Sequence, residues 1–172
     1  EKLAPSSNTA ADEISQAYAT GTTMGGELTR ANGSDSPEFL AWAIRDSLSA
    51  PLERLQIIKG WVENGETRER IYDIACESGE PDSDLHRCPP NGATVDLATC
   101  AVNPGGASEL KTLWQDPDFD AEQRAFYHVR VLERPTCRWS TWDAIRAGHL
   151  PRPDLQATIQ ERAWSSPIWY AP

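Results

Sequence analysis

The ten residues from position 124 to position 133 constrain the fold of this chain more than any other stretch. Alternate positions share small, β-branched or aromatic side chains suited to a buried surface: Ala125, Tyr127, Val129 and Val131. The intervening positions are mixed in character: Phe126, His128, Arg130 and Leu132. Because successive side chains of an extended chain point to opposite faces, this period of two predicts a β-strand with one buried face.

The surroundings of this predicted strand narrow the fold class. The acidic, turn-rich residues 116–123 lie directly before it. An acidic corner that leads into a Tyr-x-Val-x-Val strand is typical of the penultimate strand of an immunoglobulin-like sandwich, where a tyrosine lies near the strand start. This analogy concerns the fold and says nothing about function.

Further short strands are expected on both sides of it. Asn64-Gly65, between residues 55–62 and 68–76, is the strongest short-range signal for a β-hairpin. Residues 38–45 carry apolar side chains on both faces, which predicts a strand in the centre of a sheet. Other segments with strand character are 27–30, 94–100, 158–164 and 167–170, whereas residues 110–114 suit either a short helix or an irregular strand.

Two short helices complete the predicted elements. Residues 11–20 form the first, and residues 140–147 form the second, with Ser140 as N-cap and Gly148 past the end. Many short strands with few helices favour an all-β fold, an immunoglobulin-like β-sandwich with one or two short helices.

The length of 172 residues suits one domain. We expect a tail and short helix over residues 1–22 and the β-sandwich over residues 23–172. The loop at 31–37 contains the glycosylation sequon Asn32-Gly-Ser34, which matters only in a source that glycosylates secreted proteins. The chain starts at Glu1 and its only methionine is Met24, so we expect it to belong to a larger gene product.

The net charge of −10 argues against two classes of partner. Nucleic acids and anionic membrane surfaces are themselves negative and would repel such a chain. No run of residues approaches the roughly 18 apolar residues that a membrane span needs. We therefore expect no nucleic acid partner and no membrane span.

The four cysteines, Cys76, Cys88, Cys100 and Cys137, predict two disulfides. Zinc ligands usually include closely spaced cysteine pairs, which are absent here, so metal binding and free thiols are less favoured. Four cysteines allow three pairings, and the sequence alone does not select one. We favour Cys76 with Cys88 and Cys100 with Cys137. Two disulfides imply an oxidising compartment, hence a secreted or periplasmic protein.

No catalytic, cofactor-binding or metal-binding residue is predicted. His86, His128 and His149 show neither His-x-His nor i, i+4 spacing, and His128 is expected to be a structural residue within its strand. Serine-nucleophile and phosphate-loop motifs are also absent. Asp116, Asp118 and Asp120 have the spacing of Ca²⁺ ligands but lack the rest of an EF-hand, which leaves a structural cation site and a solvated corner as alternatives.

A tryptophan-rich C-terminal region is the remaining unusual feature. Its aromatic residues are Trp139, Trp142, Trp164 and Trp169, with Arg138 and Arg162 beside two of them. Three interpretations are open: packing in the core, an interface with another domain, or a platform on which sugar rings stack.

A family resemblance rests on several long blocks, taken in order along the chain. They are Gly25-Gly-Glu-Leu28, Leu55-Gln-Ile-Ile-Lys-Gly-Trp61, Thr94-Val-Asp-Leu97, Trp114-Gln-Asp-Pro-Asp-Phe-Asp120, residues 124–133, residues 135–144 and residues 161–170. Together they resemble the C-terminal part of the bacterial domain of unknown function 3604, from about residue 11 onward. Members of that family look like exported relatives of the polymerase-and-histidinol-phosphatase (PHP) metal-dependent phosphoesterases.

The resemblance implies a metal-binding motif of the Gly-Asp-Leu-His-x-His type in an upstream region, and this chain has no His-x-His. We therefore expect a non-catalytic C-terminal β-sandwich module of an exported metal-dependent hydrolase. Its expected partner is the upstream domain of the same protein. Two alternatives are a module that binds carbohydrate or envelope glycan, and an enzyme with an unrecognised site.

Overall fold

The computed structural model describes residues 10–30 and 36–172, and it is mainly β. The predicted tail before residue 10 and the sequon Asn32–Ser34 lie outside the described residues. The helices are α1 (Ala10–Thr20) and α2 (Trp139–Arg146). The strands are β1 (Glu27–Thr29), β2 (Glu38–Ile44), β3 (Leu52–Glu63), β4 (Glu66–Cys76), β5 (Glu109–Gln115), β6 (Ala125–Glu133), β7 (Thr136–Cys137), β8 (Thr158–Ile159), β9 (Arg162–Trp164) and β10 (Ile168–Ala171).

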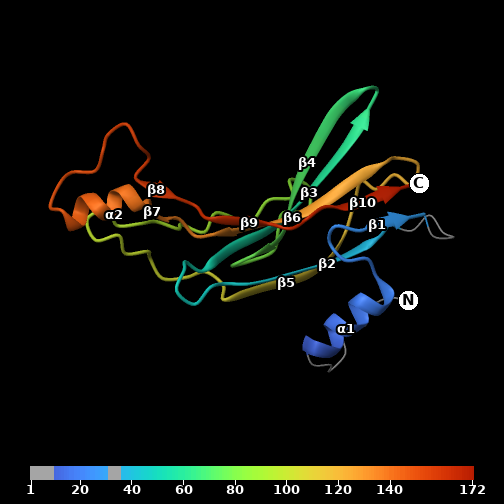
Figure 1. The fold of residues 1–172 in the computed structure, drawn as a ribbon, viewed down its shortest axis with the longest axis horizontal. Coiled ribbons are helices and arrows are strands. Elements are labelled where there is room, and N and C mark those ends of the chain that lie inside the picture. Colours follow the sequence, from blue (N-terminus) through green and yellow to red (C-terminus); the bar gives the residue numbers. More distant parts are fainter. Residues whose placement is uncertain (1–9, 31–35) are drawn as a thin grey trace.

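The predicted strand at 124–133 becomes β6 and lies in the middle of the main sheet (Figure 1). This sheet has the order β1-β10-β6-β3-β4. Strand β10 pairs with residues 125–127 of β6, and β9 pairs with residues 130–132 along the same edge of β6. Pairing is antiparallel except between β1 and β10. Ala125 and Tyr127 belong to the buried core and Val129 and Val131 pack against it, so the predicted buried face of the strand is confirmed.

The predicted hairpin is confirmed as β3–β4. Asn64 and Gly65 form its turn with positive φ values of 52° and 79°. Two positive φ values in succession are what a type I′ turn requires, and asparagine followed by glycine adopts them at least cost.

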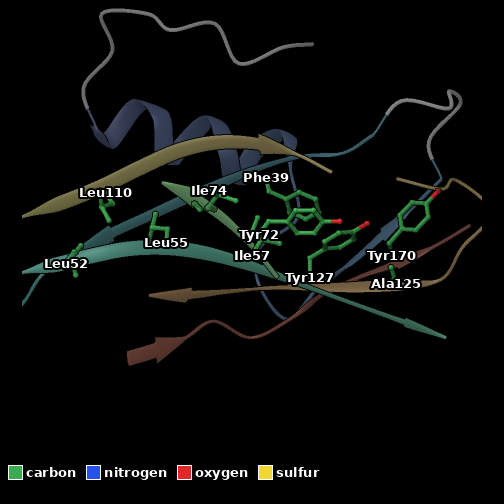
Figure 2. Packing of buried hydrophobic residues seen from close by; sticks show 11 residues of the cluster. Phe39, Leu52, Leu55, Ile57, Tyr72, Ile74, Leu110, Ala125, Tyr127 and Tyr170 are labelled. Carbon is green, nitrogen blue, oxygen red and sulfur yellow. The ribbon is translucent and has the colours of Figure 1, made fainter. Parts of the chain in front are cut away.

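A second sheet, formed in the described residues by β2 and β5, packs against one face of the main sheet, which we call the inner face. Figure 2 shows Phe39 and Leu110 of this small sheet directed toward Leu55, Ile57 and Tyr127 of the main sheet. The buried cluster between the layers consists of Phe39, Ala41, Leu52, Leu55, Ile57, Tyr72, Ile74, Leu110, Ala125, Tyr127 and Tyr170.

The expectation that residues 38–45 form a central strand is wrong. In the described part of the chain β2 pairs with β5 alone. Trp42, on the face of β2 away from the core, is held by its indole N–H, which donates to Glu109 Oε1 at 2.6 Å, and by Lys111 Nζ, 4.5 Å from the ring centroid. Such polar partners let the aromatic side chain of Trp42 lie at the surface. The apolar residues on both faces of β2 therefore did not require a neighbouring strand on each side of it.

Three other predicted elements differ in detail. Residues 94–100 form a turn with one bridge, Val95 to Val102, and not a strand, because Asp96 accepts the local N–H groups of Ala98, Thr99 and Cys100. Helix α2 begins at Trp139 with Arg138 as N-cap, two residues before the predicted N-cap Ser140, and no side chain caps it. Residues 110–114 lie in strand β5.

The mainly β prediction is confirmed, whereas the immunoglobulin-like arrangement stays a prediction that this strand order does not show. Both disulfides have the favoured pairing, Cys76–Cys88 and Cys100–Cys137. Their presence indicates an oxidising environment. Within residues 10–30 and 36–172, no helix is long and apolar enough to cross a membrane.

Candidate functional site

The aromatic residues predicted to act together separate into two places. Trp139 and Trp142 lie on α2, at one end of the molecule in Figure 1. Trp169 pairs with Phe126 and Trp164 with Arg130, which places both on the outer face of the main sheet, opposite the small sheet. The structure therefore offers two candidate surfaces where the sequence suggested one.

The first surface belongs to residues 136–159, which we call the arm; it comprises β7, α2, a loop and β8 (Figure 1). Contacts within the arm hold the two sides of its loop together. Ala157 O accepts hydrogen bonds from Arg138 N at 2.9 Å and from Thr141 Oγ1 at 2.8 Å, and Thr141 is 2% exposed. The buried Cys100–Cys137 disulfide ties the arm to the preceding loop.

This well-connected arm exposes large apolar side chains. Trp139 is 71% exposed and Leu150 is 92% exposed. Leu155 of the arm and Leu97 of the attached loop are also exposed. Trp142 is half-buried, with the guanidinium of Arg146 5.2 Å from its ring centroid. Isolated exposed leucines are ordinary, but several large apolar side chains exposed on one small element make the arm a candidate docking surface.

The second surface is a groove of about 770 Å³ on the outer face, where β3, β4, β6 and β10 meet. Its floor consists of Gly60, Phe126 and Trp169, with the Phe126 and Trp169 ring centroids 5.3 Å apart. A Cβ at position 60 would lie 2.3 Å from Phe126 Cζ, so the Phe126 ring lies across the strand only because residue 60 is glycine. Glu27, Glu69, Arg68 and Arg124 also line the groove.

The inner face holds a buried polar cluster that sequence reasoning missed: Lys59, Tyr72, Asp116, Asp118 and Tyr127. Lys59 Nζ lies 2.5 Å from Asp116 Oδ2, and both side chains are almost wholly buried. Tyr127 OH donates to the same carboxylate at 2.8 Å. Lys59 also donates to Asp118 O at 2.8 Å, so the charged pair has further polar partners.

The tyrosines of this cluster stay protonated near neutral pH, so their hydroxyls can donate hydrogen bonds to the carboxylates. Burial is the main cause that raises the pKa of Tyr72 and of Tyr127, and the nearby carboxylates raise it further. Tyr72 OH donates to Asp118 Oδ2 at 2.7 Å, and Arg70 Nη1 lies 2.7 Å from the same oxygen. The cluster therefore joins the residue 116–120 corner to β3, β4 and β6, which is a structural task.

The alternative of a solvated acidic corner is wrong for Asp116, because Lys59 and Tyr127 compensate its burial. The three carboxylates with the spacing of Ca²⁺ ligands have different partners. Asp116 pairs with Lys59, Asp118 pairs with Arg70, and Asp120 accepts a hydrogen bond from the backbone N–H of Glu122. In the described part of the chain, no three His, Cys, Asp or Glu side chains are grouped so that they could hold a metal ion.

The three histidines lie on different segments. His128 stacks on Phe126 with ring centroids 6.0 Å apart, and burial lowers its pKa. His86, in the loop closed by Cys76–Cys88, packs edge-on against Tyr72 at 5.1 Å. His149 lies in the arm, where its backbone N–H donates to Ala144 O.

One sequence signal could have located the groove. A glycine inside an apolar strand, such as Gly60 in β3, indicates the close approach of another group. The partner, Phe126, could not be identified without the register between β3 and β6.

Comparison with known protein families gives one match, over residues 2–172, to a family described as "Protein of unknown function (DUF3604)". Neither the curated proteins nor the solved structures contain a match to the chain.

Proposed function

The chain belongs to the DUF3604 family, whose function is unknown, and from that premise we propose that it is a non-catalytic C-terminal module that packs against an upstream metal-dependent hydrolase domain. The proposal includes an immunoglobulin-like sandwich as the architecture and a secreted or periplasmic location. The PHP-like character of the upstream domain rests on the resemblance of the sequence blocks described above.

The observation that carries the proposal is the exposure of Trp139 and Leu150 on the arm. Each large apolar side chain that leaves water contributes about 1.5–3 kcal/mol. The disulfide Cys100–Cys137 and the hydrogen bonds to Ala157 O already order the arm. A pre-ordered apolar surface loses little conformational entropy when it binds, which favours docking onto another folded domain.

The non-catalytic part of the proposal rests on the residue pattern. The resemblance assigns the metal ligands to a His-x-His motif upstream, and this sequence contains none. The most deeply buried carboxylates already have hydrogen-bond partners. Lys59 donates to Asp116, and Gln56 Nε2 and Cys88 N donate to Asp73. The two disulfides support the proposed location.

Calorimetry between this chain and the separately produced upstream region tests the docking. We expect binding, and we expect Trp139→Ala to weaken it at least tenfold, because a buried tryptophan at an interface is often worth about 2 kcal/mol or more. Trp169→Ala, which removes an exposed tryptophan outside the arm, is the control and should bind as the unchanged chain does. Absence of binding, or equal losses in the two variants, would overturn the proposal.

A hydrolysis assay tests the non-catalytic part separately. The purified chain, supplied with Mn²⁺, should not turn over p-nitrophenyl phosphate, whereas the upstream region should. Turnover by this chain alone, lost on substitution of its histidines, would show an enzyme site that the proposal denies.

A further inference from the structure

We propose that the groove of Gly60, Phe126 and Trp169 on the outer face binds an uncharged oligosaccharide. This inference is independent of the docking proposal, because the groove lies on the main sheet and shares no residue with the arm.

The aromatic floor provides a stacking surface. Trp169 is 51% exposed although its ring centroid lies 5.3 Å from that of Phe126. The position of Phe126 has a structural explanation, since its ring fills the space above Gly60. Trp169 has no comparable explanation, and an indole half open to a groove is suited to stack on the apolar face of a sugar ring.

The walls provide polar groups that can hydrogen-bond to hydroxyls. Among the described residues, the side chains of Glu27, Glu69 and Arg124 make no hydrogen bond or ion pair. Arg68, by contrast, is paired with Glu63 and Glu66 in the hairpin. A sugar hydroxyl both donates and accepts, so one oligosaccharide can satisfy free carboxylates and a free guanidinium together.

Charge distinguishes this ligand from anionic ones that also favour aromatic and basic side chains. The lining carries two arginines and two glutamates, so its formal charge is balanced. A lining without net positive charge offers no net attraction to the phosphates of a nucleic acid or the carboxylates of an acidic polysaccharide, and a neutral sugar needs none. The groove volume, about 770 Å³, lies within the range of about 300–1,000 Å³ typical of ligand sites.

Tryptophan fluorescence and calorimetry with neutral hexasaccharides test the proposal. The probes are cellohexaose, xylohexaose, mannohexaose and laminarihexaose, with hexagalacturonate as the anionic comparison. At least one neutral probe should bind, and Trp169→Ala should lower its affinity at least tenfold. Glu69→Gln, at an exposed position of the hairpin, should lower it about threefold or more without a change in the melting temperature.

Trp139→Ala is the control and should leave sugar binding unchanged. The proposal fails if no neutral probe binds at millimolar concentration, if hexagalacturonate binds more tightly than every neutral probe, or if Trp139→Ala loses as much affinity as Trp169→Ala. Because docking depends on Trp139 and sugar binding on Trp169, failure of one proposal leaves the other to be judged by its own variant.

Discussion

Lys59 and Asp116 form an ion pair whose side chains are almost wholly removed from water. Burial of two charges is costly, and the attraction between them, with the hydrogen bonds from Tyr127 and to Asp118 O, offsets that cost. Loss of either partner leaves the other charge buried and unpaired.

We therefore predict that Lys59→Met lowers the free energy of unfolding by about 3–5 kcal/mol, as measured by urea denaturation. Arg152→Met is the matched control, because Arg152 pairs with Asp154 in an ion pair that is well exposed. Exposed pairs contribute about 0–1 kcal/mol, so the control should be nearly neutral. Similar effects of the two substitutions would show that the buried cluster does not hold the 116–120 corner.

Gly60 permits the Phe126 ring to cross β3, and its φ is not positive, so alanine introduces no backbone strain there. We predict that Gly60→Ala destabilises the chain by about 1–3 kcal/mol, because the new methyl group overlaps Phe126. In a Phe126→Ala background the same substitution should be almost neutral. A double-mutant cycle by urea denaturation measures this coupling, and equal costs in both backgrounds would contradict the assignment.

At the scale of elements, the two disulfides hold different parts of the chain. Cys76–Cys88 spans 12 residues and closes the loop that carries His86, whereas Cys100–Cys137 spans 37 residues and fixes the base of the arm. The entropy of the unfolded chain therefore predicts a larger contribution from the second, about 4 kcal/mol against about 3 kcal/mol.

We predict that Cys100→Ser with Cys137→Ser accelerates amide hydrogen exchange in residues 138–157 and leaves the β3–β4 hairpin protected. Cys76→Ser with Cys88→Ser should instead affect residues 77–91. Mass spectrometry of peptic fragments makes both measurements. An arm that exchanges at an unchanged rate without Cys100–Cys137 would show that its own hydrogen bonds suffice to order it.

Local chemistry explains which elements the sequence could predict. The alternation in β6 and the Asn64-Gly65 turn depend on residues that are neighbours in the chain, so both were found with nearly the right bounds. Residues 94–100 looked like a strand from their apolar alternation, but Asp96 draws the backbone into a turn. Competition between a short polar side chain and strand pairing is not visible in the apolar pattern.

At the scale of the whole molecule, the contacts that sequence reasoning missed join distant residues. Lys59 meets Asp116 only because β5 of the small sheet ends above β3 of the main sheet. The tryptophans of the C-terminal region looked like one cluster, yet the chain between α2 and β9 carries them to separate surfaces. Nearness in the sequence therefore located the aromatic residues but not the surfaces that they form.

The arm projects from one end of the molecule (Figure 1), and we propose that this end packs against an upstream domain. Such packing would remove Trp139 and Leu150 from water and reduce local opening of the arm.

Amide hydrogen exchange, measured on this chain with and without the upstream region, tests whether the arm docks. We predict at least tenfold slower exchange in residues 138–157 in the presence of that region, with no change in residues 63–67 at the hairpin tip. Unchanged exchange throughout the arm, with the upstream region folded and in excess, would contradict docking through the arm.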